Sequence, residues 1–255
     1  MDHYIYLYYG FSSSIDKKIE LIKKNQFKGV FLFWDDNFFS SVKKVRAAAL
    51  DIETVHLPFD DCNELWLHGL KGEEYIQKAI MAIQSAATMK IPTVIFHVSS
   101  SDNPPPYNQL GIDRLAKVLK VCEQYKINIA LENLRRLEYL DYIYSTFQSE
   151  YLKFCFDSGH AHAFTNNIDS FPWGKYQNKL ICVHLHDNNG LYDQHLIPFT
   201  GNISWELLAK SFKEIGYSGP LTSEAVCFDC PGEKEEGFVR KIKAALEKID
   251  RYISS

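Results

Sequence analysis

The sequence lacks an apolar segment long enough to cross a membrane, and its N-terminus has no basic segment followed by a leader-like apolar run. It also lacks a basic excess, because 28 lysines and arginines stand against 32 aspartates and glutamates, for a net charge of −4. This balance gives no general basic field, so a nucleic acid is not an expected partner, although a local basic groove is still compatible with it. We therefore expect a cytoplasmic protein without a membrane partner.

No glycine- and serine-rich linker, low-complexity tract or shift in composition divides the chain. The six cysteines are scattered, and Cys155 and Cys182 fall in strand-like runs, where a reduced, buried thiol fits best. Cys227 and Cys230 have C-x-x-C spacing without a second pair, so we interpret the spacing as coincidence rather than as a zinc or redox motif. The length of 255 residues predicts one domain spanning residues 1–255.

Short apolar runs alternate eight times with segments of helical periodicity. The runs are continuous rather than alternating, which is typical of parallel strands that helices cover. The expected strands are residues 4–9, 29–34, 53–57, 92–98, 127–131, 152–156, 180–185 and 220–223. Eight such units without a linker predict an α/β protein, specifically a closed (β/α)8 TIM barrel.

Polar side chains stand at the ends of the third to the eighth expected strand, one for each strand. These residues are His56, His97, Glu132, Asp157, His184 and Glu224. The ends of barrel strands converge at one mouth, so these six side chains must lie near one another. Two buried glutamates at one mouth would repel each other, and a divalent cation removes that penalty. The pattern therefore predicts a metal site.

Three further donors lie close by in the sequence. His160 is three residues after Asp157, and Asp193 and His195 are two apart in the loop after the seventh strand. Each signal alone has an ordinary explanation: a histidine can bond a backbone carbonyl, an aspartate can cap a helix, and Glu132 can pair with a nearby arginine. The whole set beside strand ends favours a metal over these separate explanations.

Several motifs resemble one superfamily when they are read in order. The segments are HLPF (56–59), FH (96–97), ALEN (130–133), FDSGHA (156–161), VHLHD (183–187), DQH (193–195), GNISW (201–205) and SEA (223–225). Their order is similar to that of the xylose-isomerase-like TIM barrels, which include sugar epimerases and the endonuclease IV group. The resemblance covers essentially the whole chain, but its motifs are not specific to one substrate.

The resemblance to the epimerases implies one divalent metal (Zn, Mn, Co or Mg) held by Glu132, Asp157, His184 and Glu224. It also implies that Glu132 and Glu224 act as acid and base and that His160 contacts the substrate. The expected reaction is the isomerisation or epimerisation of a sugar or sugar phosphate through a metal-stabilised enediolate. We add His186 and Trp34 as candidate substrate contacts, although packing at the barrel mouth also explains an aromatic residue there. Barrels of this kind often self-associate, so a second copy of the chain is among the expected partners.

The resemblance to endonuclease IV implies a zinc phosphoesterase with two or three ions. It adds His56 and His97 beside Glu132, and a third site from His160, Asp193 and His195. All nine positions carry the expected residue type, so this alternative stays open, as does a barrel that binds metal without catalysis. The isomerase is preferred because the loop after His97 reads VSSSDNPPPY, and DNA-penetrating loops are not evident. Phe199 replaces a glycine of the G-x-G-x-I-x-W motif, which puts the geometry of that loop in doubt.

Overall fold

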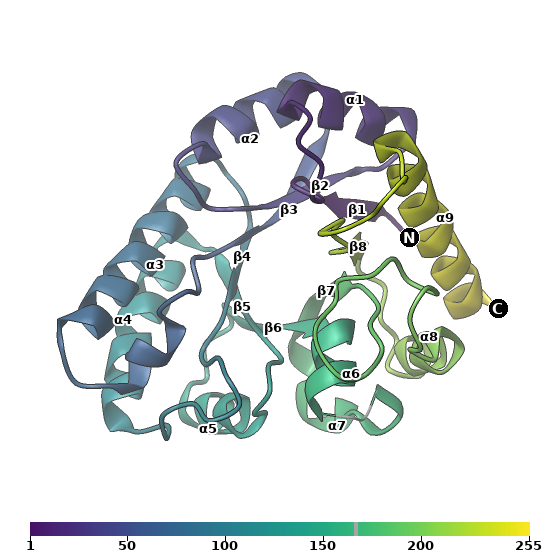
Figure 1. Cartoon of the computed structure of the whole chain (residues 1–255). Coiled ribbons are helices and arrows are strands. Elements are labelled where there is room, and N and C mark those ends of the chain that lie inside the picture. The colour runs from purple at the N-terminus through teal and green to yellow at the C-terminus, as the bar shows by residue number, and fades with distance from the viewer. Residues whose placement is uncertain (166–167) are drawn as a thin grey trace.

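A computed structural model describes residues 1–165 and 168–255 and shows parallel strands closed into a barrel (Figure 1). Each strand pairs with its neighbours in sequence order, and the first strand closes on the last. The strands are β1 (His3–Tyr6), β2 (Gly29–Phe33), β3 (Asp51–His56), β4 (Thr93–Phe96), β5 (Asn128–Glu132), β6 (Leu152–Asp157), β7 (Leu180–Leu185) and β8 (Leu221–Ser223). The prediction of a (β/α)8 TIM barrel is confirmed.

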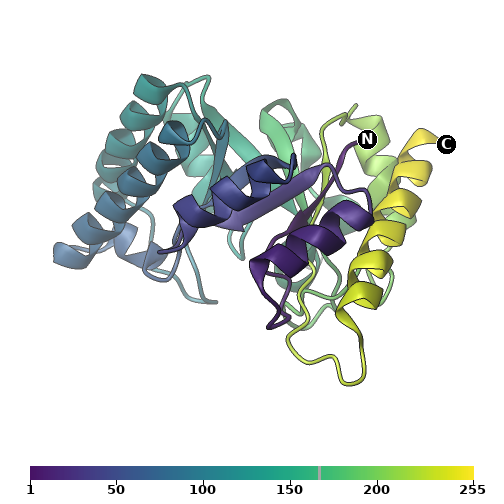
Figure 2. The ribbon, with the colours of Figure 1, turned by 90° about the horizontal axis from the view of Figure 1, so that it is seen from above.

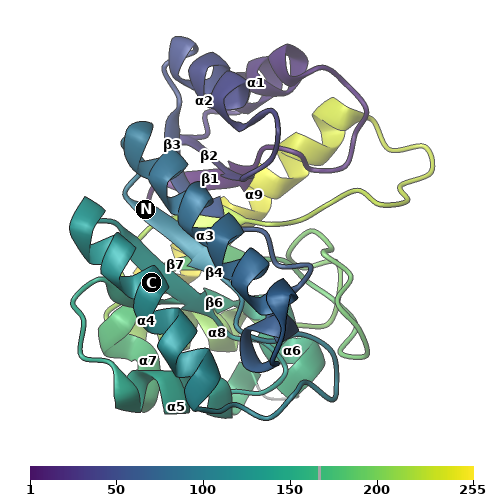
Figure 3. The same cartoon turned by 90° about the vertical axis from the view of Figure 1, so that its left-hand side faces the viewer.

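Helices surround the barrel and cover the outer face of its strands (Figures 1 and 2). They are α1 (Ile15–Lys24), α2 (Phe38–Ala47), α3 (Leu70–Thr88), α4 (Gln109–Tyr125), α5 (Glu138–Thr146), α6 (Ser158–Thr165), α7 (Trp173–Tyr176), α8 (Trp205–Glu214) and α9 (Glu235–Ser254). Short 3-10 turns occupy Cys62–Trp66, Ile168–Ser170 and Gln177–Lys179. The long helices α3 and α4 lie side by side (Figure 3). Among the described residues, no helix is both long enough and apolar enough to span a membrane.

Local sequence explains where several of these elements begin. Helix α1 starts after Ser14, whose hydroxyl accepts a hydrogen bond from the Lys17 amide, as the serine-rich segment predicts. Its apolar residues Ile19 and Ile22 are buried against the barrel, and its lysines face solvent or acidic partners. The chain ends meet on one side of the barrel, where the N-terminal amino group pairs with Asp250 at 2.6 Å (Figure 2).

The barrel has two apolar regions. The larger one fills the space between the strands and the outer helices. The smaller one lies inside the barrel and consists of Ile95, Ala130, Cys155 and Cys182. Both cysteines are free and buried, as predicted.

Some predicted details differ from the structure. Strand β1 ends at Tyr6 rather than Tyr9, because the chain turns out of the sheet and the Tyr9 carbonyl instead accepts a hydrogen bond from the Cys227 amide. Helix α6 was not expected, and it begins directly after β6 without a connecting loop. Cys227 and Cys230 form a disulfide, so interpreting their spacing as coincidence was wrong.

Candidate metal centre

Six donor side chains meet at the carboxyl ends of the strands, as predicted. Four stand within the last two residues of β3, β5, β6 and β7, and two directly follow β4 and β8. All are buried, and they are His56, His97, Glu132, Asp157, His184 and Glu224. One donor atom from each of Glu132, Asp157, His184 and Glu224 lies within 4.8 Å of the others. These four residues form a group, here called the central group, of the size that one cation requires.

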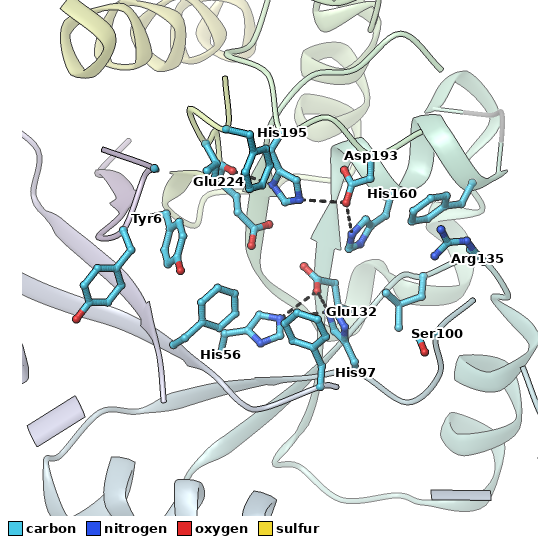
Figure 4. A pocket seen from close by; sticks show the side chains of 18 of the residues that line it. Tyr6, His56, His97, Ser100, Glu132, Arg135, His160, Asp193, His195 and Glu224 are labelled. Carbon is cyan, nitrogen blue, oxygen red and sulfur yellow. Dashed lines mark hydrogen bonds and ion pairs between the residues drawn. The ribbon is translucent and has the colours of Figure 1, made fainter. Parts of the chain in front are cut away.

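A second group adjoins the central group through Glu132. His56 Nε2 lies 3.2 Å from His97 Nε2, and Glu132 Oε2 contacts both rings (Figure 4). His56 Nδ1 lies 2.7 Å from the Leu57 carbonyl oxygen. Because that carbonyl can only accept, Nδ1 carries a proton, and Nε2 is the ring atom directed into the site.

A third group lies on the other side of the central group. Asp193 Oδ2 is 3.3 Å from His160 Nε2 and 3.0 Å from His195 Nε2 (Figure 4). The Nδ1 atoms of these histidines face the carbonyl oxygens of Asn133 and Glu224, at 3.1 and 3.0 Å. Both Nδ1 atoms therefore carry a proton, and both Nε2 atoms face the Asp193 carboxylate, to which they donate while the rings are charged and no cation is bound. The structure thus brings all nine predicted donors into three adjoining groups.

His186 stands between the central and third groups. Its Nε2 lies 3.0 Å from Asp157 Oδ2, and its Nδ1 lies 3.6 Å from Asp193 Oδ1. Gly159 makes this position accessible to the ring, because a Cβ atom there would lie 1.9 Å from His186 Cε1. The glycine of the FDSGHA segment is therefore a packing requirement.

Two polar residues that the sequence did not single out hold the donors in place. Asn133 accepts a hydrogen bond from the Asp157 amide at 2.8 Å and donates one to the Asp157 carbonyl at 2.9 Å, which ties the ends of β5 and β6 together. Asp187 accepts hydrogen bonds from the amides of Asn188, Phe199 and Ile203 and from the Trp205 indole. It thereby anchors the loop that carries Asp193 and His195. Asn133 is the last residue of the ALEN motif and Asp187 is the last residue of VHLHD. Their positions beside the predicted donors could have indicated this supporting role from the sequence.

The loop after β7 also settles the question raised by Phe199. This residue has φ +74°, a left-handed conformation that favours glycine, and its ring packs on Trp205 with centroids 5.6 Å apart. Lys248 lies over the same ring at 4.0 Å. Packing therefore holds Phe199 in a conformation that a glycine adopts without steric cost.

Opposite charges dominate the electrostatics of the donors in the protein without a bound ion. Burial works against the charged carboxylates, but the charge and hydrogen bonds of His184 hold the pKa values of Glu132 and Glu224 well below their usual range. Burial also disfavours a charged His184, yet Glu224 and Glu132 raise its pKa well above the ordinary value. The glutamates are therefore ionised at neutral pH.

The donors fit a divalent cation. Carboxylate oxygens and imidazole nitrogens are ligands for Zn, Mn, Co and Mg in different proportions. Asp193 Oδ1 is buried and has no hydrogen-bond partner within the described chain, although it stands beside two imidazoles. A buried carboxylate oxygen without a donor is costly, and a cation would satisfy it.

Seven of the nine donors line a cavity of about 570 Å³, and Asp157 and His184 do not. His160 lines this cavity, as expected for a substrate contact, whereas Trp34 and His186 do not. Trp34 packs against the outer core instead, because it follows the inward-facing Phe33 in an extended segment and so faces the other way. His186 is fully buried. Phe33 and Phe59 form an apolar wall of the cavity.

Comparison with known proteins places this architecture in a family. The model of the xylose isomerase-like TIM barrel family matches residues 19–249. The uncharacterized protein MJ1311 of Methanocaldococcus jannaschii is 27% identical over 233 residues, which cover 83% of this chain and 79% of that protein. The uncharacterized protein y4fM of Sinorhizobium fredii is 25% identical over 210 residues, covering 76% of this chain and 66% of that protein.

Solved structures share the fold across the full length of the chain. A D-tagatose 3-epimerase-like protein has a TM-score of 0.76 at 23% identity, with 100% of this chain and 98% of that chain covered. D-psicose 3-epimerase from Clostridium cellulolyticum H10 has a TM-score of 0.80 at 15% identity, with 99% of each chain covered. IOLI protein with a bound zinc atom has a TM-score of 0.74 at 16% identity, with 100% and 98% covered. The family match over residues 19–249 shows that this chain belongs to the xylose isomerase-like TIM barrels.

Proposed function

We propose that the protein is a divalent-metal-dependent isomerase or epimerase acting on a sugar or sugar phosphate. One observation carries the proposal: Glu132 and Glu224 reach His184 Nδ1 from different strands, at 2.7 and 3.2 Å, and both line the same cavity. Two carboxyl groups beside one ligand position can act on a single substrate carbon, one as an ionised base and the other as an acid once it has taken up a proton. An epimerase that moves a proton between two faces needs such a pair.

The central group of Glu132, Asp157, His184 and Glu224 would hold the cation. When bound there, a divalent cation supplies Lewis acidity that polarises a substrate carbonyl and acidifies the neighbouring C–H bond. The structures named as D-tagatose 3-epimerase-like protein and D-psicose 3-epimerase share this fold, which supports the choice of reaction class. The shared fold does not by itself assign their substrates to this chain.

The protein's own residues then handle the proton. One ionised glutamate takes the proton from the carbon beside the carbonyl. The other glutamate takes up a proton from solvent and delivers it to that carbon, on the opposite face for an epimerisation. His160 Nε2 faces the cavity, and the contact of its Nδ1 with the Asn133 carbonyl fixes the ring so that it can bind a substrate oxygen. Phe33 and Phe59 line the same cavity as His160, and their apolar rings would keep water away from the bound substrate.

The test measures exchange of the substrate α-proton with solvent. The protein is loaded with Mn²⁺, Co²⁺ or Mg²⁺ and incubated in D₂O with ketoses and ketose phosphates, and NMR follows the loss of the α-proton signal. We expect exchange with the wild type and its loss in Glu224→Gln at saturating metal. Glu235→Gln is the matched control, because Glu235 is also a mostly buried carboxylate but bonds Tyr9, Ser13 and Lys18 outside the donor groups. Exchange that persists in Glu224→Gln contradicts the acid–base assignment.

Phosphoester hydrolysis is the second candidate, and the second and third donor groups favour it. They would let two or three zinc ions bind side by side, an arrangement suited to activating water against a phosphate. Arg135 is the single arginine or lysine among the described residues lining the cavity, which argues against a long nucleic acid and for a small phosphoester. Elemental analysis discriminates: one ion per chain supports the isomerase, and two or three tightly held zinc ions support the hydrolase.

A further inference from the structure

A carboxylate outside the donor groups lies inside the barrel, one layer below them. Glu53 is on β3, which has one more residue than β2 between the pairs Val30–Ile52 and Leu32–Val55. Such a bulge re-aims side chains. The Glu53 carboxylate accepts a hydrogen bond from the Thr222 hydroxyl on β8, across the barrel interior. Neither the proposed reaction nor the sequence motifs give this residue a role.

The contact with Thr222 places Glu53 beneath His184. Thr222 is the cross-strand partner of His184 in the pairing of β7 with β8. The charge of His184 also acts on Glu53: burial raises the pKa of the Glu53 carboxyl to about 7, and His184 counteracts part of that rise. The register of β7 with β8 and the hydrogen bond from Thr222 to Glu53 therefore put the two side chains in one neighbourhood.

Two buried polar atoms in this neighbourhood lack partners within the described part of the chain. They are His184 Nε2 and Glu53 Oε1. His184 Nδ1 faces Glu132 and Glu224, so it is the nitrogen that can bind a cation. An imidazole with a free lone pair on Nδ1 carries its proton on Nε2, and a buried N–H requires an acceptor. Glu53 Oε1 is an acceptor without a donor.

Solvent space reaches Glu53 from the amino ends of the strands, although His184 does not line it. A cavity of about 540 Å³ opens at the amino ends of the strands and is lined by Glu53, Thr54 and Cys182. A polar cavity of this size holds ordered water, which bridges buried polar groups. The Phe31 ring stacks on one face of the His184 imidazole, with ring centroids 4.6 Å apart. This stacking limits how the His184 ring can move.

We propose that Glu53 is the positioning residue of the metal centre: its carboxylate accepts the Nε2 proton of His184 through a bridging water. This contact would keep Nδ1 free for the cation and fix the plane of the ring. Carboxylates that accept the second N–H of a ligating histidine do the same in other metal sites. The inference rests on the metal site of the proposed function but not on the reaction or on the substrate.

Metal affinity is the first readout. Co²⁺ binding to the full-length protein is measured by competition with a chromophoric chelator, for the wild type, Glu53→Ala, Glu53→Gln and the control Glu235→Gln. We expect Glu53→Ala to weaken binding about 10- to 100-fold, Glu53→Gln to weaken it less, and the control to match the wild type. If Glu53→Ala does not fold, the isosteric Glu53→Gln still has to lose affinity. Wild-type affinity in a folded Glu53 variant overturns the proposal.

The second readout is specific to the hydrogen bond. In the Zn²⁺-loaded protein, ¹⁵N-edited NMR should show a slowly exchanging downfield proton on His184 Nε2, and this signal should disappear in Glu53→Ala. A Nε2 proton that exchanges equally fast in the wild type and in the variant overturns the proposal. Isomerase activity does not enter either readout. If the protein turns over no sugar while the Glu53 variants lose affinity and the signal, the proposed reaction fails and this inference stands.

Discussion

The two sides of the barrel mouth differ in chemistry. On β1 and β2 the cavity-facing side chains are aromatic, and Tyr6 packs on Phe31 and Phe33 with ring centroids 4.9 and 5.1 Å apart. From β3 to β8, every strand instead has a carboxylate or an imidazole in its last two residues or directly after its end. The donor side can bind a cation and move protons, whereas the aromatic side has neither a carboxylate nor an imidazole and mainly packs and excludes water. Changes on the two sides should therefore affect different measurements.

The largest effect is expected from Asp157→Asn on the donor side. Asp157 is fully buried, accepts a hydrogen bond from the His160 amide at 2.6 Å and lies 3.0 Å from His186 Nε2. Removing its charge leaves the cation with one anionic ligand fewer, so we expect metal affinity to fall about 100-fold or more and activity to fall with it. Chelator competition measures the affinity. Unchanged affinity would mean that Asp157 is only a helix cap.

The next largest effect is expected from His195→Gln, which tests whether the third donor group takes part in the isomerase reaction or binds a further metal ion. His195→Gln should leave the central group able to bind one cation and should reduce kcat/KM by about 10-fold if His195 only helps bind substrate. Elemental analysis of the variant and of the wild type gives the metal count. If the variant loses one zinc ion per chain and also loses phosphodiesterase activity, the result contradicts the proposed isomerase and supports the hydrolase.

The donor side should also make stability depend on pH when no metal is bound. Burial disfavours a charged His195, but its hydrogen bond to Asp193 and the charge of Glu224 raise its pKa to about 9. An unfolded histidine has a pKa of about 6.5, so this interaction stabilises the fold fully below pH 6.5 and is lost as the pH rises through 9, by up to about 3 kcal/mol. Urea unfolding in EDTA at pH 6 and pH 9.5 measures the difference. If the unfolding free energy of His195→Gln depends on pH as strongly as that of the wild type, His195 is not the source of the pH dependence.

The smallest effect is expected on the aromatic side. Phe33→Leu keeps an apolar side chain but reduces the wall area, so we expect KM to rise about 3-fold with metal affinity unchanged. Phe39→Leu is the matched control, because Phe39 is 45% exposed on α2 and does not line the cavity. A loss of metal affinity in Phe33→Leu would show that the two sides are not separable.

The sequence predicts the donor side better than the rest of the site, for a physical reason. A polar residue that ends an apolar run marks the carboxyl end of a buried strand, and barrel closure brings those ends together; β7 has its predicted bounds, and His184 stands at its end. Trp34 was predicted on the wrong face because neighbouring strand residues point to opposite sides, and the apolar run does not show which one faces inward. Glu53 was missed because a bulge turns it into the barrel.

Helix α6 and the loop after β7 were harder to predict for another reason. The α6 sequence SGHAHAFT has weak helical periodicity, because its histidines face donors rather than a uniform apolar core. Phe199 takes a left-handed conformation that its residue type does not suggest. Its packing on Trp205 and Lys248 and the hydrogen bond from its amide to Asp187 hold that conformation. Tertiary contacts, which a linear pattern does not contain, decide both features.

Anomalous diffraction from crystals grown with Mn²⁺ tests the central claim most directly. We expect one strong peak within bonding distance of Glu132, Asp157, His184 and Glu224, because these four residues form the most complete donor group at the mouth. A peak anywhere else, or no peak at a saturating Mn²⁺ concentration, would contradict a metal-dependent isomerase built on these residues.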